Sequence, residues 1–190
     1  MGKVTWGFTS SLDGFITGPN HDMSWMSGLG PLAEGTVEDL ASQVAVIISG
    51  RRGYDAAKAQ ADERDELTSE AYGGAWEGTE FILTHRPEEL AGDSAVTALN
   101  CTIAEAVDRA QLIAGDRDIQ IISADIGRQA LEVGLIDEMQ MFVAPIFLGD
   151  GTRVFDVPGG RRVYWELVET DAANESAWFR RFRPKHAQSN

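Results

Sequence analysis

Cysteine and histidine are scarce in this chain of 190 residues, which has one cysteine, Cys101, and three histidines. A single cysteine cannot form an internal disulfide, and it excludes metal sites built from several cysteines. The sequence also lacks HExxH, in which two histidines on one helix face bind zinc. We therefore expect no metal site. Cys101 has no nearby His or Lys in sequence to activate it, so we interpret it as an ordinary small residue.

Basic residues are also few: 16 Lys and Arg stand against 30 Asp and Glu, which gives a formal net charge of −14. Such a chain repels phosphate backbones and anionic membrane surfaces, so nucleic acids and membranes are not expected partners. No run approaches the roughly 18 apolar residues of a membrane span. The first residues also lack the apolar stretch of a signal peptide. These features predict a cytoplasmic protein.

Three familiar motifs of nucleotide-binding and hydrolytic enzymes are missing, namely GxGxxG, GxxxxGK[ST] and GxSxG. Classical dinucleotide-binding, P-loop and hydrolase functions therefore lack their usual sequence support. The composition is nevertheless that of a globular domain, with 43% hydrophobic and 24% charged residues. The length predicts a single domain, which we expect at residues 1–183, followed by a C-terminal tail at 184–190.

Hydrophobic patterning predicts strands that alternate with helices, followed by a closing pair of strands. Apolar or alternating runs predict strands at residues 4–9, 44–49, 79–84, 95–99, 119–122, 137–147, 162–168 and 176–183. Helical spacing predicts helices at residues 32–43, 51–60, 103–114 and 125–133, the third of which is capped by Thr102 and ended by Gly115. Glycine, proline and polar residues predict loops at 10–30 and 61–78 and a hairpin turn at 171–174. This order indicates one α/β domain with a mixed sheet.

The loop at residues 10–30 contains the candidates for proton transfer. Loops of this length inside a compact domain are usually functional. Asp13, His21 and Asp22 could act as acids or bases, although solvated loop carboxylates are common. Trp25 could line a substrate pocket for a ring compound, or it could anchor the loop. The sequence leaves these alternatives open.

Three expected junctions at strand ends carry residues that suit an anionic ligand. In open α/β sheets, ligands bind at the carboxyl ends of strands, beside helix N-termini. The junctions are Gly50-Arg51-Arg52, Thr84-His85-Arg86 and Ile122-Ser123-Ala124. Arginine at the first two junctions suits a phosphate. The alternatives are surface arginines, a polar turn and simple helix capping.

Five segments in unbroken order resemble one known family. They are residues 10–16 (SSLDGFI), 50–55 (GRRGYD), 82–87 (ILTHRP), 134–138 (GLIDE) and 145–155 (PIFLGDGTRVF). Together they resemble the dihydrofolate-reductase-like superfamily, and within it the C-terminal reductase domain of the riboflavin-biosynthesis deaminase-reductase. The resemblance extends over about residues 2–183.

The resemblance implies a three-layer fold, in which helices flank a mixed, mostly parallel sheet that ends in an antiparallel C-terminal hairpin. It also implies NADPH as the cofactor, with hydride transfer to a small pyrimidine- or pterin-like heterocycle. The riboflavin-type substrate is 5-amino-6-(5-phosphoribosylamino)uracil. The chain has no zinc motif of a deaminase, so we expect a reductase domain alone.

The resemblance also implies positions for the cofactor and a second copy of the chain. Thr9 and Ile16 would lie along the nicotinamide, and the arginines of the first junction would face the cofactor phosphates. Residues 84–86 would face the adenosine 2′-phosphate. Family members commonly pair through the C-terminal part of the sheet. Apolar residues at 139–147, with Trp165 and Trp178, therefore favour a homodimer.

Two departures from the family pattern concern cofactor binding. A glycine doublet of the family falls on Ile122-Ser123, where a branched side chain would meet the pyrophosphate and could not easily adopt glycine-only conformations. Gly53 replaces a threonine. These changes support an alternative function, a non-catalytic member with a degraded dinucleotide site that binds a small ligand or a protein. The stretch after Trp25 also lacks the acidic residue of folate reductases, so folate reduction is not expected.

Overall fold

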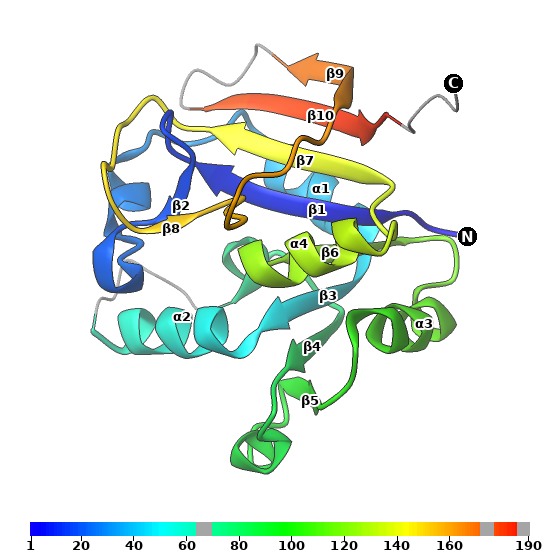
Figure 1. The fold of residues 1–190 in the computed structure, drawn as a ribbon. Coiled ribbons are helices and arrows are strands. Elements are labelled where there is room, and N and C mark those ends of the chain that lie inside the picture. The colour runs from blue at the N-terminus through cyan, green and yellow to red at the C-terminus, as the bar shows by residue number, and fades with distance from the viewer. Residues whose placement is uncertain (64–69, 172–176, 186–190) are drawn as a thin grey trace.

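An eight-stranded sheet runs through the centre of the computed structural model, which describes residues 1–63, 70–171 and 177–185 (Figure 1). Its strands are β1 Val4–Ser10, β3 Val44–Gly50, β4 Thr79–Leu83, β5 Val96–Leu99, β6 Asp118–Ile122, β7 Glu138–Val143, β9 Trp165–Asp171 and β10 Trp178–Pro184. Their spatial order is β5-β4-β3-β6-β1-β7-β10-β9. The neighbouring strands of the series β5-β4-β3-β6-β1-β7 pair in parallel, whereas β10 pairs antiparallel with β7 and β9. The predicted mixed, mostly parallel sheet with a closing antiparallel pair is confirmed.

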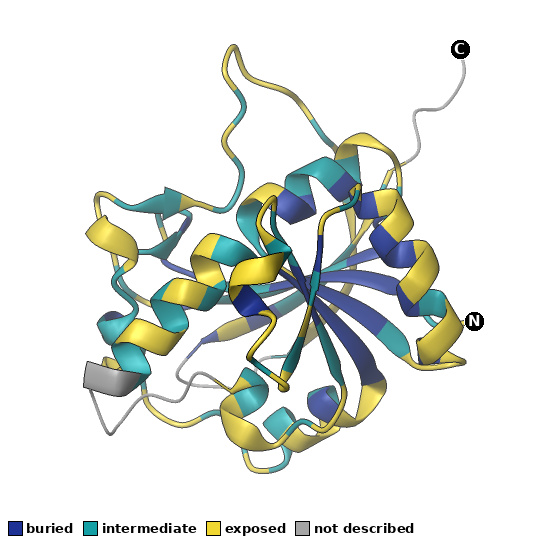
Figure 2. Ribbon diagram, turned by 90° about the horizontal axis from the view of Figure 1, so that it is seen from below, coloured by how far each residue is buried: buried dark blue, intermediate teal, exposed yellow. Residues whose placement is uncertain are grey.

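Helices lie on both faces of this sheet, as Figures 1 and 2 show. They are α1 Thr36–Gln43, α2 Arg51–Glu63, α3 Ile103–Ala114 and α4 Ala124–Glu132. Helices α3 and α4 pack against the apolar side chains of β1, β3 and β6, and this contact forms the main core. The predicted cap of α3 is confirmed: Glu105 N donates to Thr102 Oγ1, and Thr102 N donates to Glu105 Oε2. None of the helices in the described ranges is long and apolar enough to cross a membrane.

Several predicted boundaries differ from the structure. Helix α1 begins four residues later than predicted, because Gly35 directly before it has a left-handed φ of 81°. Strand β7 ends at Val143, and Pro145 beyond it has no N–H to donate to a neighbouring strand. Helix α2 extends to Glu63 into the predicted loop, and β9 begins only at Trp165. Most of the predicted hairpin turn lies outside the described residues.

A second, two-stranded sheet was not predicted. β2 Phe15–Thr17 lies inside the predicted loop and pairs antiparallel with β8 Thr152–Arg153. Strands this short carry no periodic pattern, so only the tertiary contact between distant segments defines them. The sheet is closely packed, because a Cβ on Gly151 would lie 1.9 Å from the Thr17 carbonyl oxygen.

Helix α4 approaches β1 very closely. A Cβ on Gly127 of α4 would lie 2.2 Å from the indole of Trp6 in β1, whose side chain is almost fully buried. The indole Nε1 also donates a hydrogen bond of 3.1 Å to the carbonyl oxygen of Ser123, the residue that caps α4. Trp6 therefore positions the start of α4 relative to the centre of the sheet.

We expect Gly127→Ala to destabilise the fold, because the added methyl group has no room beside Trp6. Overpacking of this kind costs about 1–3 kcal/mol. Gly53→Ala in α2 is the matched control: its methyl group meets no atom within 4 Å, and it should stabilise the helix by roughly 0.5–1 kcal/mol. Urea unfolding followed by circular dichroism measures both. Equal stability of the two variants would contradict this packing.

Candidate functional site

The carboxyl ends of the parallel strands bring the three predicted junctions to one edge of the sheet. β3 and β6 are neighbours, with Ser49 opposite Ile122, and they lead directly into α2 and α4. A Cβ on Gly50 would lie 3.2 Å from Ser123 Oγ, so these two turns are almost in contact. On the other side of β3, Gly50 pairs with Leu83, the last residue of β4. Two helix N-termini and the end of β4 therefore converge here.

The ends of β1 and β7 form the neighbouring part of this edge. Asp13 follows β1, and its carboxylate accepts hydrogen bonds from Ser11 Oγ at 2.6 Å, Gly149 N at 2.8 Å and Leu148 N at 3.2 Å. Arg153 Nη1 donates to the Asp13 carbonyl oxygen at 3.2 Å. Two of the family-like segments, which lie far apart in sequence, are thus joined through one aspartate.

These contacts determine the chemistry of Asp13. The hydrogen bond from Ser11, with those from Gly149 and Leu148, lowers the pKa of Asp13 from 3.8 to about 2. The carboxyl group is therefore ionised at neutral pH and cannot donate a proton. In the structure Asp13 connects two loops, and its catalytic role stays a prediction.

The other two proton-transfer candidates also have partners. The Asp22 carboxylate accepts from Ser24 N at 3.1 Å and from Ser24 Oγ at 2.8 Å. The His21 carbonyl oxygen accepts from Gln60 of α2 at 2.9 Å, and its Nδ1 lies 3.4 Å from Thr152 Oγ1. His21 is exposed. The structure thus leaves its imidazole accessible to a ligand at this edge.

Trp25 is buried, with 9% of its surface exposed, and its indole N–H has no hydrogen-bond partner in the described part of the chain. This placement favours the interpretation that Trp25 anchors the loop over the one that it contacts a substrate. Thr9 and Ile16 are half-buried, Thr9 near the end of β1 and Ile16 in β2. They therefore border the same edge.

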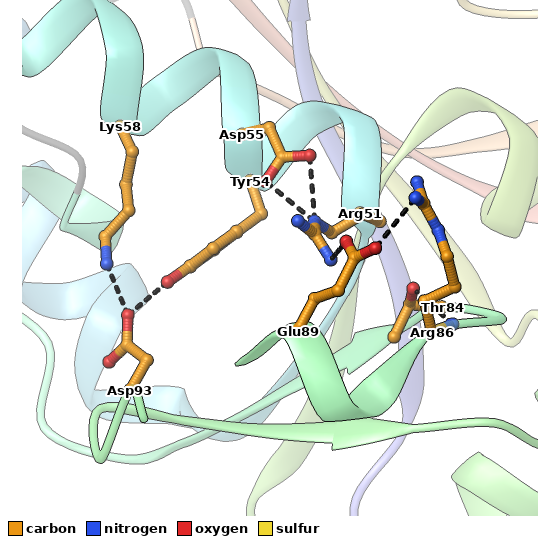
Figure 3. Close-up of polar contacts among 8 residues, drawn as sticks. All are labelled: Arg51, Tyr54, Asp55, Lys58, Thr84, Arg86, Glu89 and Asp93. Carbon is orange, nitrogen blue, oxygen red and sulfur yellow. Dashed lines mark hydrogen bonds and ion pairs between the residues drawn. The ribbon is translucent and has the colours of Figure 1, made fainter. Parts of the chain in front are cut away.

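Two of the three predicted phosphate-binding arginines, Arg51 and Arg86, are held by carboxylates (Figure 3). Arg51 Nε donates to both oxygens of Asp55, at 2.7 and 2.8 Å, and Arg51 Nη1 lies 3.0 Å from Glu89 Oε2. Arg86 Nη1 lies 2.7 Å from the other oxygen of Glu89. One carboxylate thus bridges the two arginines, in the position where the sequence predicted a phosphate.

Other residues of these junctions are less constrained. Arg52 is exposed and forms no ion pair with any residue that the structure describes. His85 is exposed as well. Thr84 Oγ1 accepts from Arg86 N at 3.1 Å, a local hydrogen bond of a polar turn, and the role of this segment toward a 2′-phosphate stays a prediction. Arg52 is therefore the cation of the first junction that remains available to a ligand.

A second group of charges lies beside the arginines, where Tyr54 and Lys58 of α2 both donate to Asp93 (Figure 3). An open cleft of about 540 Å³ is lined by these residues together with Asp55 and Glu89. The hydrogen bond from Lys58, and then that from Tyr54, lowers the pKa of Asp93 well below its usual value. The cleft is therefore rich in carboxylates, and the cation of Lys58 is already neutralised.

The turn at Ile122-Ser123 differs from the prediction in one respect and agrees in another. Ser123 has an extended backbone, with φ −170° and ψ 138°, and Ile122 has no positive φ, so neither residue needs a glycine-only conformation here. Ser123 Oγ accepts from Ile126 N at 3.4 Å, which confirms the capping interpretation. The Ile122 side chain is 39% exposed at this edge. Ala124 is the first residue of α4.

Two polar features were missed in the sequence. Glu80 of β4 accepts a hydrogen bond of 2.9 Å from Ser49 Oγ, and burial raises the pKa of its carboxyl group. An acid inside the apolar run TEFILT could have indicated it. Tyr72 donates to Gln120 Oε1 at 2.6 Å, and burial raises the pKa of Tyr72 to about 12. No pattern in the sequence indicates that Tyr72 lies over the sheet.

The sheet order, the helix positions and this carboxyl edge define the dihydrofolate-reductase-like fold. Residues 75–178, more than half of the chain, match the family model of the RibD C-terminal domain. The chain belongs to this family. The resemblance found in the sequence is thereby confirmed for both family and fold.

Individual relatives are distant. The chain is 24% identical over 163 residues to the uncharacterized protein YyaP of Bacillus subtilis strain 168, covering 84% of this chain and 83% of that protein. It is similar to the crystal structure of a putative riboflavin biosynthesis protein from Shewanella sp. PV-4, with TM-score 0.73, 18% identity and coverage of 97% and 99%. Dihydrofolate reductase from Enterococcus faecalis, complexed with NADP(H) and RAB-propyl, matches with TM-score 0.61, 13% identity and 97% of each chain. At these identities the structural matches show the fold.

We expect Glu80→Gln to raise the melting temperature at neutral pH. Burial raises the folded-state pKa of Glu80 above its ordinary value of 4.5, so the wild type loses stability as pH rises from 4.5 through the raised pKa. The glutamine keeps an acceptor for Ser49 and removes the buried charge. The gain should disappear below pH 4, where Glu80 is protonated. Melting curves at several pH values measure this, with exposed Glu77→Gln as the control; a gain that does not depend on pH would contradict it.

Proposed function

We propose that the protein is a cytoplasmic, NADPH-dependent oxidoreductase that reduces a small pyrimidine- or pterin-like heterocycle of the riboflavin-biosynthesis type. The observation that carries the proposal is the near contact of the β3–α2 and β6–α4 turns, at Gly50 and Ser123. Helix N-termini present unpaired N–H groups and the positive end of the helix dipole, which attract a phosphate. Membership of the RibD C-terminal domain family supports the same function.

The residues at this edge fit an anionic dinucleotide. Gly50 leaves open the space that a Cβ would take beside Ser123, so the backbone can approach a pyrophosphate there. In this proposal the pyrophosphate binds the N–H groups at the starts of α2 and α4, including that of Ala124, with Arg52 beside it. Thr9 and Ile16 would contact the nicotinamide, which supplies the hydride. The chain binds and orients both reactants, and exposed His21 is the candidate that moves a proton.

We expect Glu89 to weaken the binding of NADPH. Its carboxylate is paired with Arg51 and Arg86, and it would repel a 2′-phosphate at this position. A charge-assisted bond contributes roughly 1.5–3 kcal/mol. Glu89→Gln should therefore raise the affinity for NADPH by about tenfold or more and leave the affinity for NADH almost unchanged. Arg86→Ala should lower the affinity for NADPH only. Calorimetric titration with both cofactors measures this. Exposed Glu88→Gln is the control, and equal gains for NADPH and NADH would show that Glu89 does not face the 2′-phosphate.

The alternative function is a family member with a degraded dinucleotide site that binds a small ligand or a protein. The exposed Ile122 side chain at this edge and the paired arginines favour it. In that case the wild type binds no NADPH, and Ile122→Gly with Ser123→Gly restores binding by tenfold or more. The same titration distinguishes the two functions. Low-micromolar NADPH binding by the wild type, or no gain in a stably folded double variant, would show that Ile122 does not block the cofactor.

We also propose a homodimer that forms through the C-terminal strands. β9 is the outer strand of the sheet, and Leu167, Val168 and Trp178 on β9 and β10 are 52%, 43% and 51% exposed. An exposed edge strand with apolar side chains favours pairing with another chain. Sedimentation equilibrium should give twice the chain mass of 20.7 kDa. A single species of about 21 kDa at micromolar concentration would contradict the dimer.

A further inference from the structure

A pocket of about 410 Å³ lies between the sheet and the segment 154–165, which we call the strap. Its floor is formed by Trp6 and Phe8 of β1 and by Met139 and Met141 of β7, and Leu131 of α4 forms one side. None of the residues that line it belongs to the three junctions or to the loop at residues 10–30. The pocket is therefore separate from the candidate cofactor site.

The strap is part of the folded structure at both of its ends. It crosses β7 and β1 in Figure 1, and Val154 N donates to the Gly14 carbonyl oxygen at 3.0 Å. At the other end, Lys185 N donates to the Tyr164 carbonyl oxygen at 2.8 Å. Phe155 and Trp165 pack against the core from the strap. The pocket is thus enclosed on two sides by ordered parts of the chain.

Aromatic and methionine side chains dominate the lining. Five aromatic residues contribute to it, and the indole N–H of Trp6 is already donated to Ser123, so its ring offers only an apolar surface. Methionine sulfur packs favourably against aromatic rings. Small-molecule sites typically have volumes of roughly 300–1,000 Å³ and linings of mostly hydrophobic and aromatic side chains. The lining therefore suits a flat, apolar ring.

The lining of the pocket contains two cations, Arg161 and Arg162, although the whole chain carries a net charge of −14. Arg161 lies 3.9 Å from Glu132, whose same oxygen is already paired with Arg128 at 2.7 Å. Arg162 forms no ion pair within the ranges that the structure describes. A guanidinium beside an apolar pocket is well placed to bind a carboxylate.

We propose that this pocket binds a planar aromatic carboxylate, with its ring against Trp6, Phe8 and the methionines and its carboxylate on Arg162. A second copy of the chain is a less suitable occupant of this pocket. In a two-fold symmetric contact centred on the pocket, Arg161 and Arg162 of both copies would face one another, and like charges in an interface are unfavourable. The proposal does not depend on the function proposed above.

The test uses 2-naphthoate as the probe and neutral 2-naphthamide as its matched analogue, titrated into the full chain without NADPH. Tryptophan fluorescence and calorimetry report binding, because Trp6 and Trp165 line the pocket. We expect Arg162→Gln to weaken naphthoate at least tenfold, since a bond to a charged group contributes roughly 1.5–3 kcal/mol, and to leave naphthamide unchanged. Arg109→Gln, a charge change on the exposed part of α3, should alter neither.

Filling the pocket should abolish binding of both probes. Leu131→Trp fills the pocket from α4, and Val163→Trp fills the pocket from the strap. If one of the two variants misfolds, the other still tests the proposal. The proposal is overturned if naphthoate and naphthamide bind equally, or if naphthoate does not bind at millimolar concentration. It is also overturned if NADPH displaces naphthoate. The same holds if the wild type is a dimer that does not bind the probe and that dissociates when Arg161 and Arg162 are substituted, because the pocket is then a dimer interface.

Discussion

The contact between the Trp6 indole and the backbone of Gly127 determines where α4 lies, and the candidate site depends on it. Because residue 127 has no Cβ, the helix can rest directly on the ring, and the ring N–H then binds the Ser123 carbonyl oxygen. This holds the start of α4 beside Gly50, at the edge where two helix N-termini meet. The side chain of Trp6 also lines the pocket under the strap. One buried tryptophan thus connects both surfaces to the core.

Electrostatics explains why the arginines do not by themselves indicate a ligand. In a chain with 30 acidic and 16 basic residues, a cation readily pairs with a carboxylate of the protein itself. Arg51 is paired with Asp55 and Glu89, and Lys58 with Asp93, so their charges are largely neutralised before any ligand binds. A phosphate must compete with these carboxylates. Arg52 and Arg162 form no ion pair with any residue that the structure describes, so they are more informative about a ligand than the paired arginines.

Much of the fold could be predicted, because its long elements have regular patterns. The buried run of β3 and the capped helix α3 appear in the sequence as an apolar stretch and as helical spacing after Thr102. The short pair β2 and β8 could not be predicted, since neither strand has a side-chain period and each exists only through its partner. The contacts of Asp13 could not be predicted for the same reason. Its role depends on Leu148 and Gly149, which lie far along the chain.

The sequence by itself determined the family, the order of the strands and helices, and the candidate edge, because these depend on local periodicity and on motifs kept in order. Only the tertiary structure decided which candidate groups are available. It paired Arg51 and Arg86 with Glu89, gave Ser123 an ordinary extended backbone, and enclosed a pocket between Trp6 and the strap. Hydrogen bonds, ion pairs and cavities depend on distances between segments that are remote in sequence, and a linear pattern does not contain those distances.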